Sequence, residues 1–239
     1  MKNLIYEIVD KYLMNNFSKD IAKIFYEKQN EKLIIFDIGC FKGNFSRSIK
    51  KEFKNSQFYL FDANNSINSE TFNDLETFKF FPFAVYDEET DKDYFFNTFF
   101  PASGSSIDSN VKNDFIWKLT RKIITLDFFG KFEKKKVKTI TLNSFCKKNS
   151  IDQIDILKID VEGSELNVLK GSDLILKKTR CILVEITDTK NNFLEKYNLI
   201  IDFLKKKNFK LLLKKNIISY SILSNQEGVD ALFINEEFK

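Results

Sequence analysis

The chain has 239 residues, of which 43% are hydrophobic, so it is long enough to bury one substantial core. Its 38 basic and 34 acidic side chains leave a formal charge of +4, which is too small to indicate nucleic-acid binding by itself. Three cysteines without a CxxC pair suggest neither a disulfide framework nor a zinc site, and no segment approaches the about 20 apolar residues of a membrane span. We therefore expect a cytoplasmic protein without a transmembrane segment.

The first 30 residues carry apolar side chains at helical spacing, interrupted between Asn16 and Lys19. This pattern predicts two amphipathic helices. We expect them to pack on the core of a single domain formed by residues 31–239.

Residues 33–46, LIIFDIGCFKGNFS, run from an apolar strand into Asp37 and then place Gly39 and Gly43 four residues apart. A loop that approaches a ligand through its backbone has no room for Cβ atoms, and the following helix presents free N–H groups. The third glycine of a dinucleotide-binding loop is missing, and a carboxylate suits a cation better than a pyrophosphate. S-adenosylmethionine carries such a cation, so the pattern predicts a site for it. This site also includes Phe41 and Asn44.

Beyond this loop the pattern predicts a helix at 44–54, a strand at 57–62, a helix at 66–77 and a strand at 78–86. Asp62 ends the second strand, 23 residues after Gly39, where an acidic side chain accepts ribose hydroxyls. Ala84, near the end of the third strand, is a further expected cofactor contact.

Residues 87–136 interrupt the alternation of strand and helix, and we interpret them as an insertion or lid. Ser105 and Ser106 lie in its small-residue stretch, PASGSSIDS, and are the expected acceptor-binding hydroxyls. A basic run from Lys131 to Lys138 follows, for which a solvated face is the favoured interpretation.

The alternation then resumes, with a strand at 137–142, a helix at 143–149, a strand at 154–160, a helix at 163–177, a strand at 181–186, a helix at 191–206 and strands at 209–213 and 231–235. Such alternation predicts an α/β fold with a mostly parallel sheet covered by helices on both faces. Ligands bind such sheets beyond the carboxyl ends of the strands. We therefore expect one rim to carry Asp37, Asp62, Ala84, Asp160 and Glu185.

The stretch ILKIDVEGSELNVLKGS, residues 156–172, packs Lys158, Asp160 and Glu162 at the end of an apolar strand. Strand spacing places them on one side until the strand ends, so they are the candidate catalytic residues. The alternative is structural: Lys158 forms an ion pair with Asp160 or Glu185, and Glu162 favours the N-terminus of the next helix.

Together with FDIGCFKGNFS, FAV, SGSSI and VKTITLNSF, this stretch closely resembles the FkbM family of methyltransferases. The resemblance implies a class I, Rossmann-like fold with a seven-stranded sheet. It also implies transfer of a methyl group from S-adenosylmethionine to a hydroxyl of a sugar or natural product. The chain departs from the family pattern at Cys40-Phe41, at Asp62-Ala63 and at Thr187, where the family often has histidine.

The chain contains no histidine, so Asp160, Glu162 and Lys158 are the candidates for the group that takes the acceptor's proton. Glu185 is expected to bind the acceptor. A magnesium ion held by Asp160, Glu162 and Glu185 is the less favoured alternative, and we expect no metal.

Three rival functions remain open. A nicotinamide-dependent oxidoreductase is disfavoured by the missing third glycine, and a non-catalytic protein is expected not to bind the methyl donor. An RNA methyltransferase is expected to use the basic run at Lys131–Lys138, but we expect a small-molecule or glycan acceptor and no nucleic acid. The sequence does not indicate an oligomeric state.

Overall fold

The computed structural model describes residues 17–28, 30–64, 67–73, 76–98, 105–107, 132–217 and 225–238. The first of the two predicted N-terminal helices lies outside these residues. Residues 17–24 are helical, and Phe17 and Ile21 are buried against the sheet. The helix includes residues 17–19, where the sequence suggested a break. No helix in the described part of the chain is both long and apolar enough to cross a bilayer.

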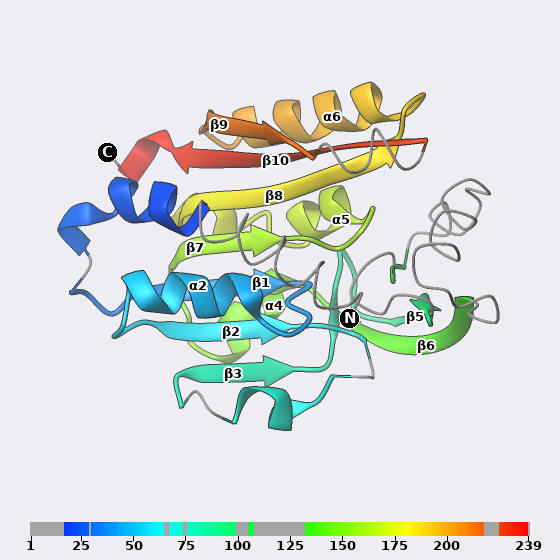
Figure 1. The fold of residues 1–239 in the computed structure, drawn as a ribbon, viewed down its shortest axis with the longest axis horizontal. Coiled ribbons are helices and arrows are strands. Elements are labelled where there is room, and N and C mark those ends of the chain that lie inside the picture. Colours follow the sequence, from blue (N-terminus) through cyan, green and yellow to red (C-terminus); the bar gives the residue numbers. More distant parts are fainter. Residues whose placement is uncertain are drawn as a thin grey trace, which may run out of the picture.

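Seven strands form one sheet in the order β3-β2-β1-β7-β8-β10-β9 (Figure 1). Their bounds are β1 Ile34–Ile38, β2 Gln57–Phe61, β3 Phe78–Phe81, β7 Ile154–Ile159, β8 Thr179–Thr189, β9 Phe209–Asn216 and β10 Gln226–Asn235. The first five strands of this order pair in parallel, and β10 is antiparallel to both of its neighbours. Strand order reverses between β1 and β7, the point where sheets of this kind bind ligands. The predicted seven-stranded, mostly parallel sheet is confirmed.

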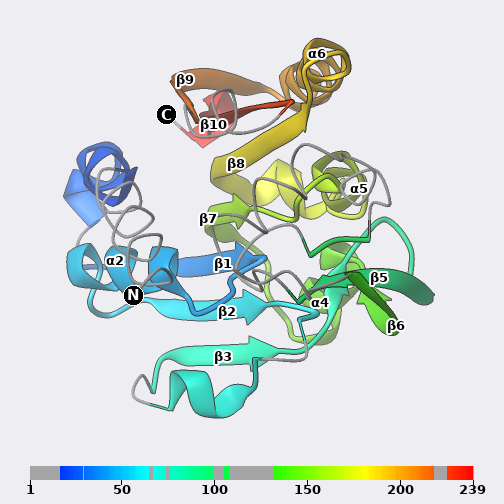
Figure 2. The same ribbon diagram turned by 45° about the vertical axis from the view of Figure 1, so that its right-hand side comes forward.

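Helices cover both faces of the sheet, as predicted. Figure 2 shows residues 17–24 and α2 (Asn44–Glu52) on one side, with α4 (Leu142–Lys148), α5 (Glu165–Lys170) and α6 (Phe193–Lys205) on the other. Successive strand residues point to opposite faces, so Ile35 joins the cluster beneath α2 whereas Phe36 joins the cluster beneath α4. The sheet is therefore buried on both sides, which explains its apolar strands.

Two predicted elements of the first half are wrong. The strand at 78–86 is divided, because Pro82 has no N–H to continue the ladder. After it, β4 (Ala84–Val85) leaves the main sheet and pairs with β6 (Phe132–Ile140), so Ala84 lies opposite Thr139 and not on the rim of the main sheet. The helix at 66–77 is reduced, among its described residues, to a 3-10 turn at Ser69–Phe72.

The predicted helix at 163–177 also ends early. It divides into α5 and a 3-10 turn at Ile175–Lys178, with Gly171 between them. A Cβ atom on Gly171 would lie 2.0 Å from the Tyr86 carbonyl oxygen, so the chain here packs closely against the segment after β4. Ser172 and Asp173, which follow Gly171, have short polar side chains that favour a turn rather than the continuation of a helix.

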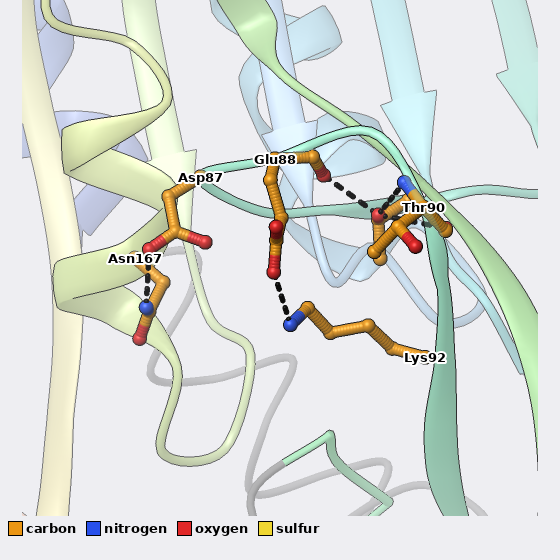
Figure 3. Close-up of polar contacts among 6 residues, drawn as sticks. Asp87, Glu88, Thr90, Lys92 and Asn167 are labelled. Carbon is orange, nitrogen blue, oxygen red and sulfur yellow. Dashed lines mark hydrogen bonds and ion pairs between the residues drawn. The ribbon is translucent and has the colours of Figure 1, made fainter.

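A ribbon formed by β5 (Asp91–Asn97) and β6 projects from the domain (Figure 1). Its base is fixed by the Thr139 hydroxyl, which donates to the Glu88 carbonyl at 2.7 Å and accepts from the Thr90 N–H at 2.9 Å. The Asn167 side-chain amide donates to Asp87 at 2.7 Å and ties this base to α5 (Figure 3). The described part of the predicted insertion is therefore an ordered β-ribbon with fixed attachment; its role as a lid stays a prediction.

Candidate active site

The loop between β1 and α2, residues 39–43, is shaped by its backbone. Gly39, Phe41 and Gly43 have φ angles of 75°, 44° and 72°, in the left-handed region. A Cβ atom on Gly39 would lie 1.7 Å from the Asp160 carbonyl oxygen, so only glycine fits there. The Gly39 N–H also donates to the Phe61 carbonyl at 2.9 Å. This 39–43 loop therefore lies directly against the carboxyl ends of β2 and β7. Asn44 follows it as the first residue of α2.

Asp62 holds the 39–43 loop from the end of β2. One carboxylate oxygen accepts the Phe41 N–H at 2.7 Å, and the other accepts the Asn64 N–H at 2.8 Å. Burial raises the pKa of Asp62 to about 6. Each carboxylate oxygen offers two lone pairs, so Asp62 retains acceptor capacity for ribose hydroxyls. The predicted ribose contact is compatible with this geometry and stays a prediction.

Asp37 lies elsewhere than the sequence suggested. Its side chain is buried, its Oδ2 accepts the Ser46 hydroxyl at 2.7 Å, and its Oδ1 lies 3.3 Å from the Lys158 Nζ. Strand alternation turns this side chain under α2, beneath the loop. We therefore interpret Asp37 as a support of the loop, whereas the sequence pattern suggested a direct contact with the cofactor's cation.

Lys158 connects the loop to the end of β7. Its Nζ lies 3.0 Å from the Asp160 Oδ2, and it donates to the Gly39 carbonyl at 3.1 Å. The ion pair between Lys158 and Asp160 is therefore present in the structure. We interpret Lys158 as a residue that positions Asp160, and its role as a base stays a prediction.

Three carboxylates lie in neighbouring positions across the sheet. Asp160 follows the last paired residue of β7 and lies beside Glu185 of β8, and Glu185 pairs in register with Asp230 of β10. Burial raises the pKa of the Glu185 carboxyl well above its usual range, and the neighbouring carboxylates raise it further. Asp230 was not predicted as a site residue, although a single carboxylate inside the apolar stretch VDALFIN was a signal.

Glu162 lies in the turn between β7 and α5, residues 161–164. Its φ is 53°, and that of Gly163 is 120°. The Ser106 hydroxyl donates to the Val161 carbonyl at 3.2 Å, and Ser105 accepts the Asn97 N–H at 3.0 Å. The two serines predicted to bind the acceptor therefore lie beside this 161–164 turn. Each also makes a hydrogen bond that fixes the ribbon.

Tyr94 of β5 also reaches the site, although the sequence did not predict it. Its side chain is buried, with contacts to Ser105. Burial and the negative charges of Asp62 and Glu162 raise the pKa of its phenol well above the usual range. Its hydroxyl therefore lies within the electrostatic field of both the expected cofactor carboxylate and the expected catalytic carboxylate.

The strand order, the loop at the reversal point and the carboxylate that ends β2 together define a class I methyltransferase fold. Residues 83–211 match the model of the methyltransferase FkbM domain, which is more than half of the chain. The chain therefore belongs to this family. The match begins after the 39–43 loop and Asp62, so the assignment of the cofactor side rests on geometry.

The chain is similar to the 2-O-methyltransferase NoeI of Sinorhizobium fredii, with 26% identity over 168 residues. The match covers 65% of this chain and 63% of that relative's length. Among solved structures, TrmK of M. capricolum with S-adenosyl-homocysteine aligns at a TM-score of 0.46 and 12% identity, covering 92% of this chain and 67% of that one. TYW2 of M. jannaschii with AdoMet aligns at 0.44 and 13% identity, covering 92% and 75%.

The residues at the reversal point fit S-adenosylmethionine, the methyl donor of this class. Asp62 offers acceptor lone pairs beside the backbone of Phe41, and the start of α2 faces the same loop. In the described part of the chain, no three acidic or cysteine side chains are arranged to hold a metal ion. The carboxylates of Asp37 and Asp160 instead contact the ammonium of Lys158.

Proposed function

We propose that the protein transfers a methyl group from S-adenosylmethionine to a hydroxyl of a sugar, a glycan or a related natural product. One observation carries the proposal: in a chain without histidine, four carboxylates lie around the end of β7, where Asp160 lies against Gly39 of the 39–43 loop. A sugar hydroxyl is too weak an acid to ionise at neutral pH, so a carboxylate must accept its proton as the new bond forms. The carboxylates of this group are Asp160, Glu162, Glu185 and Asp230.

The donor, when bound, supplies an electrophilic methyl group. Asp62 accepts the ribose hydroxyls, and the backbone of the 39–43 loop lines the cofactor. Asp160 and Glu162 orient the acceptor hydroxyl and take its proton, while Lys158 holds Asp160 in place at 3.0 Å. Glu185 and Tyr94 border the acceptor from β8 and from the ribbon. Much of the rate then comes from orientation and exclusion of water.

The name of the similar 2-O-methyltransferase supports a hydroxyl acceptor. The RNA alternative depends on the basic face of β6, and two of its lysines already face an acid. Lys134 and Lys136 lie 2.6 Å and 2.9 Å from the Asp93 carboxylate. This neutralisation weakens the field that phosphates need, which favours a small or glycan acceptor over nucleic acid.

The test is mass spectrometry after incubation with isotopically labelled donor and a matched panel of oligosaccharides, small alcohols and RNA. We expect label on a carbohydrate hydroxyl. Label on RNA alone, or on a nitrogen, overturns the proposal.

With an acceptor in hand, Asp160→Asn and Glu162→Gln separate the catalytic roles from cofactor binding. We expect turnover to fall by about 10² to 10⁴, as for loss of a general base, while calorimetry shows nearly unchanged affinity for S-adenosylhomocysteine. Near-normal turnover in both variants assigns these carboxylates to the Lys158 ion-pair network alone.

A further inference from the structure

A buried ion pair lies directly behind the 161–164 turn. The Lys196 Nζ of α6 lies 2.6 Å from the Oε2 of Glu165, the first residue of α5. The Glu165 side chain is 1% exposed and the Lys196 side chain 12% exposed. Removing two charges from water is costly, so such a pair persists only where further hydrogen bonds satisfy both groups.

Those further hydrogen bonds all go to the backbone around the site. The Lys196 Nζ donates to the Gly163 carbonyl at 2.9 Å and to the Thr187 carbonyl at 2.9 Å. The Oε1 of Glu165 accepts the Gly163 N–H at 2.7 Å. The ammonium of Lys196 therefore has two backbone carbonyl acceptors in addition to its ion pair with Glu165. The pair therefore binds both backbone groups of Gly163: Glu165 accepts its N–H, and Lys196 donates to its carbonyl.

Gly163 directly follows Glu162, whose φ of 53° is disfavoured for a residue with a Cβ atom. Such a conformation persists only where the surroundings enforce it. Thr187, the second backbone contact of Lys196, lies two residues after Glu185 on β8. One ammonium thus joins the segment that carries Glu162 to the strand that carries Glu185.

We propose that Glu165 and Lys196 are positioning residues for the acceptor side of the site. The pair holds Glu162 in its left-handed conformation and fixes its distance from Glu185, without touching the acceptor or the donor. This inference rests on the proposed function, because it assigns the pair to the same carboxylates. The cofactor side, held by Asp62 and by the backbone of the 39–43 loop, is independent of the pair.

Lys196→Met is the main test, because it keeps the aliphatic stem and removes all three donors. We expect kcat to fall about 10- to 100-fold, the range that small misplacements of reacting groups produce, with unchanged affinity for S-adenosylhomocysteine. Lys196→Arg, which keeps the charge and donors, restores part of the loss. Glu165→Gln, which keeps volume and one acceptor oxygen, serves if Lys196→Met does not fold.

The matched control is Lys215→Met. Lys215 pairs with Asp20 at 2.8 Å on the opposite face of the sheet, so this variant also loses an ion pair but should keep wild-type turnover. Equal losses in Lys215→Met and Lys196→Met, or turnover of Lys196→Met within twofold of wild type, overturn the inference.

Hydrogen exchange provides a readout that needs no acceptor. In Lys196→Met we expect faster exchange at Gly163, whose N–H depends on Glu165, and unchanged exchange at Gly39. Unchanged exchange at Gly163 contradicts the proposed role. A wild-type enzyme that methylates no hydroxyl contradicts the proposed function instead, and the exchange comparison then decides the positioning role alone.

Discussion

The 39–43 loop and the 161–164 turn lie side by side at the carboxyl edge of the sheet, yet different forces hold them. In the loop, glycines adopt left-handed angles and backbone N–H groups bind the carbonyl of Phe61. In the turn, a glutamate adopts such an angle, and the buried pair of Glu165 and Lys196 surrounds it. Substitutions that add atoms should therefore most affect the stability and ligand affinity of the loop. Substitutions that change charge should most affect the turn and its neighbouring carboxylates.

The largest expected effect tests the steric side of this comparison, with Gly39→Ala. A Cβ atom 1.7 Å from the Asp160 carbonyl cannot be accommodated without moving β1 or β7, and the φ of 75° adds strain. We expect a loss of about 3 kcal/mol or more in the free energy of unfolding, typical of severe overpacking and strain. Binding of S-adenosylhomocysteine should become undetectable by calorimetry.

Gly171→Ala is the matched control for that substitution. Its Cβ atom would lie 2.0 Å from the Tyr86 carbonyl, but its φ is negative and it lies away from the loop. It should destabilise the fold while the folded fraction keeps normal affinity for S-adenosylhomocysteine. If Gly39→Ala also keeps that affinity, the 39–43 loop is not the cofactor loop.

The position of the 39–43 loop after the first strand, and of Asp62 after the second, could be predicted from the sequence, because these signals are local. An apolar strand that ends in an aspartate and two spaced glycines already predicts a ligand loop, and Asp62 follows at a regular distance. Asp230 and Tyr94 were missed. A carboxylate in an apolar strand was a signal for Asp230, but its position beside Glu185 depends on strand register, and Tyr94 reaches the site through the pairing of the ribbon.

The errors in secondary structure have equally specific causes. Pro82 was a visible signal for the end of β3, yet the apolar residues on both sides of it suggested one strand. The predicted helix at 66–77 contains Phe72, which ends a 3-10 turn. In the structure it packs on Phe78 and Phe80, with ring centroids 6.3 Å and 5.2 Å apart.

An intermediate effect is expected for Asp62→Asn, which removes the charge of the side chain that accepts the Phe41 N–H of the loop. An amide offers one acceptor oxygen where the carboxylate offers two, so affinity for S-adenosylhomocysteine should fall about 10- to 100-fold at pH 7.5, the size of one or two hydrogen bonds to a charged group.

The pH dependence sharpens this test. The pKa of Asp62 is raised to about 6, so wild-type affinity should fall as the pH drops through 6 and Asp62 becomes protonated. The ratio of the wild-type affinity for S-adenosylhomocysteine to that of Asp62→Asn should then decrease toward one at pH 5. Asp152→Asn, at an exposed carboxylate, should leave the affinity unchanged at both pH values. A ratio that is constant with pH contradicts a direct ribose contact.

The smallest expected effect is a gain of stability in Glu185→Gln, and it tests the charge-sensitive side. Burial and neighbouring carboxylates raise the pKa of Glu185 above its unfolded value, so the folded state binds the proton more tightly. Its contribution to stability is therefore fully present below the unfolded pKa and is lost as the pH rises through the folded pKa. The glutamine side chain of the variant does not ionise, so the variant does not lose this stability. Its advantage over wild type in the free energy of unfolding should therefore increase between pH 5 and pH 8. We expect about 1 kcal/mol at pH 8, the typical size of a single substitution, measured by thermal unfolding. The control Glu195→Gln, exposed on α6, should show no such trend.

Turnover of Glu185→Gln should fall at the same time, because functional sites keep groups that are unfavourable for stability. A variant that is more stable and fully active would remove Glu185 from the acceptor site. A variant without the pH trend would show that neither burial nor the carboxylates at Asp160 and Asp230 raise the pKa of Glu185.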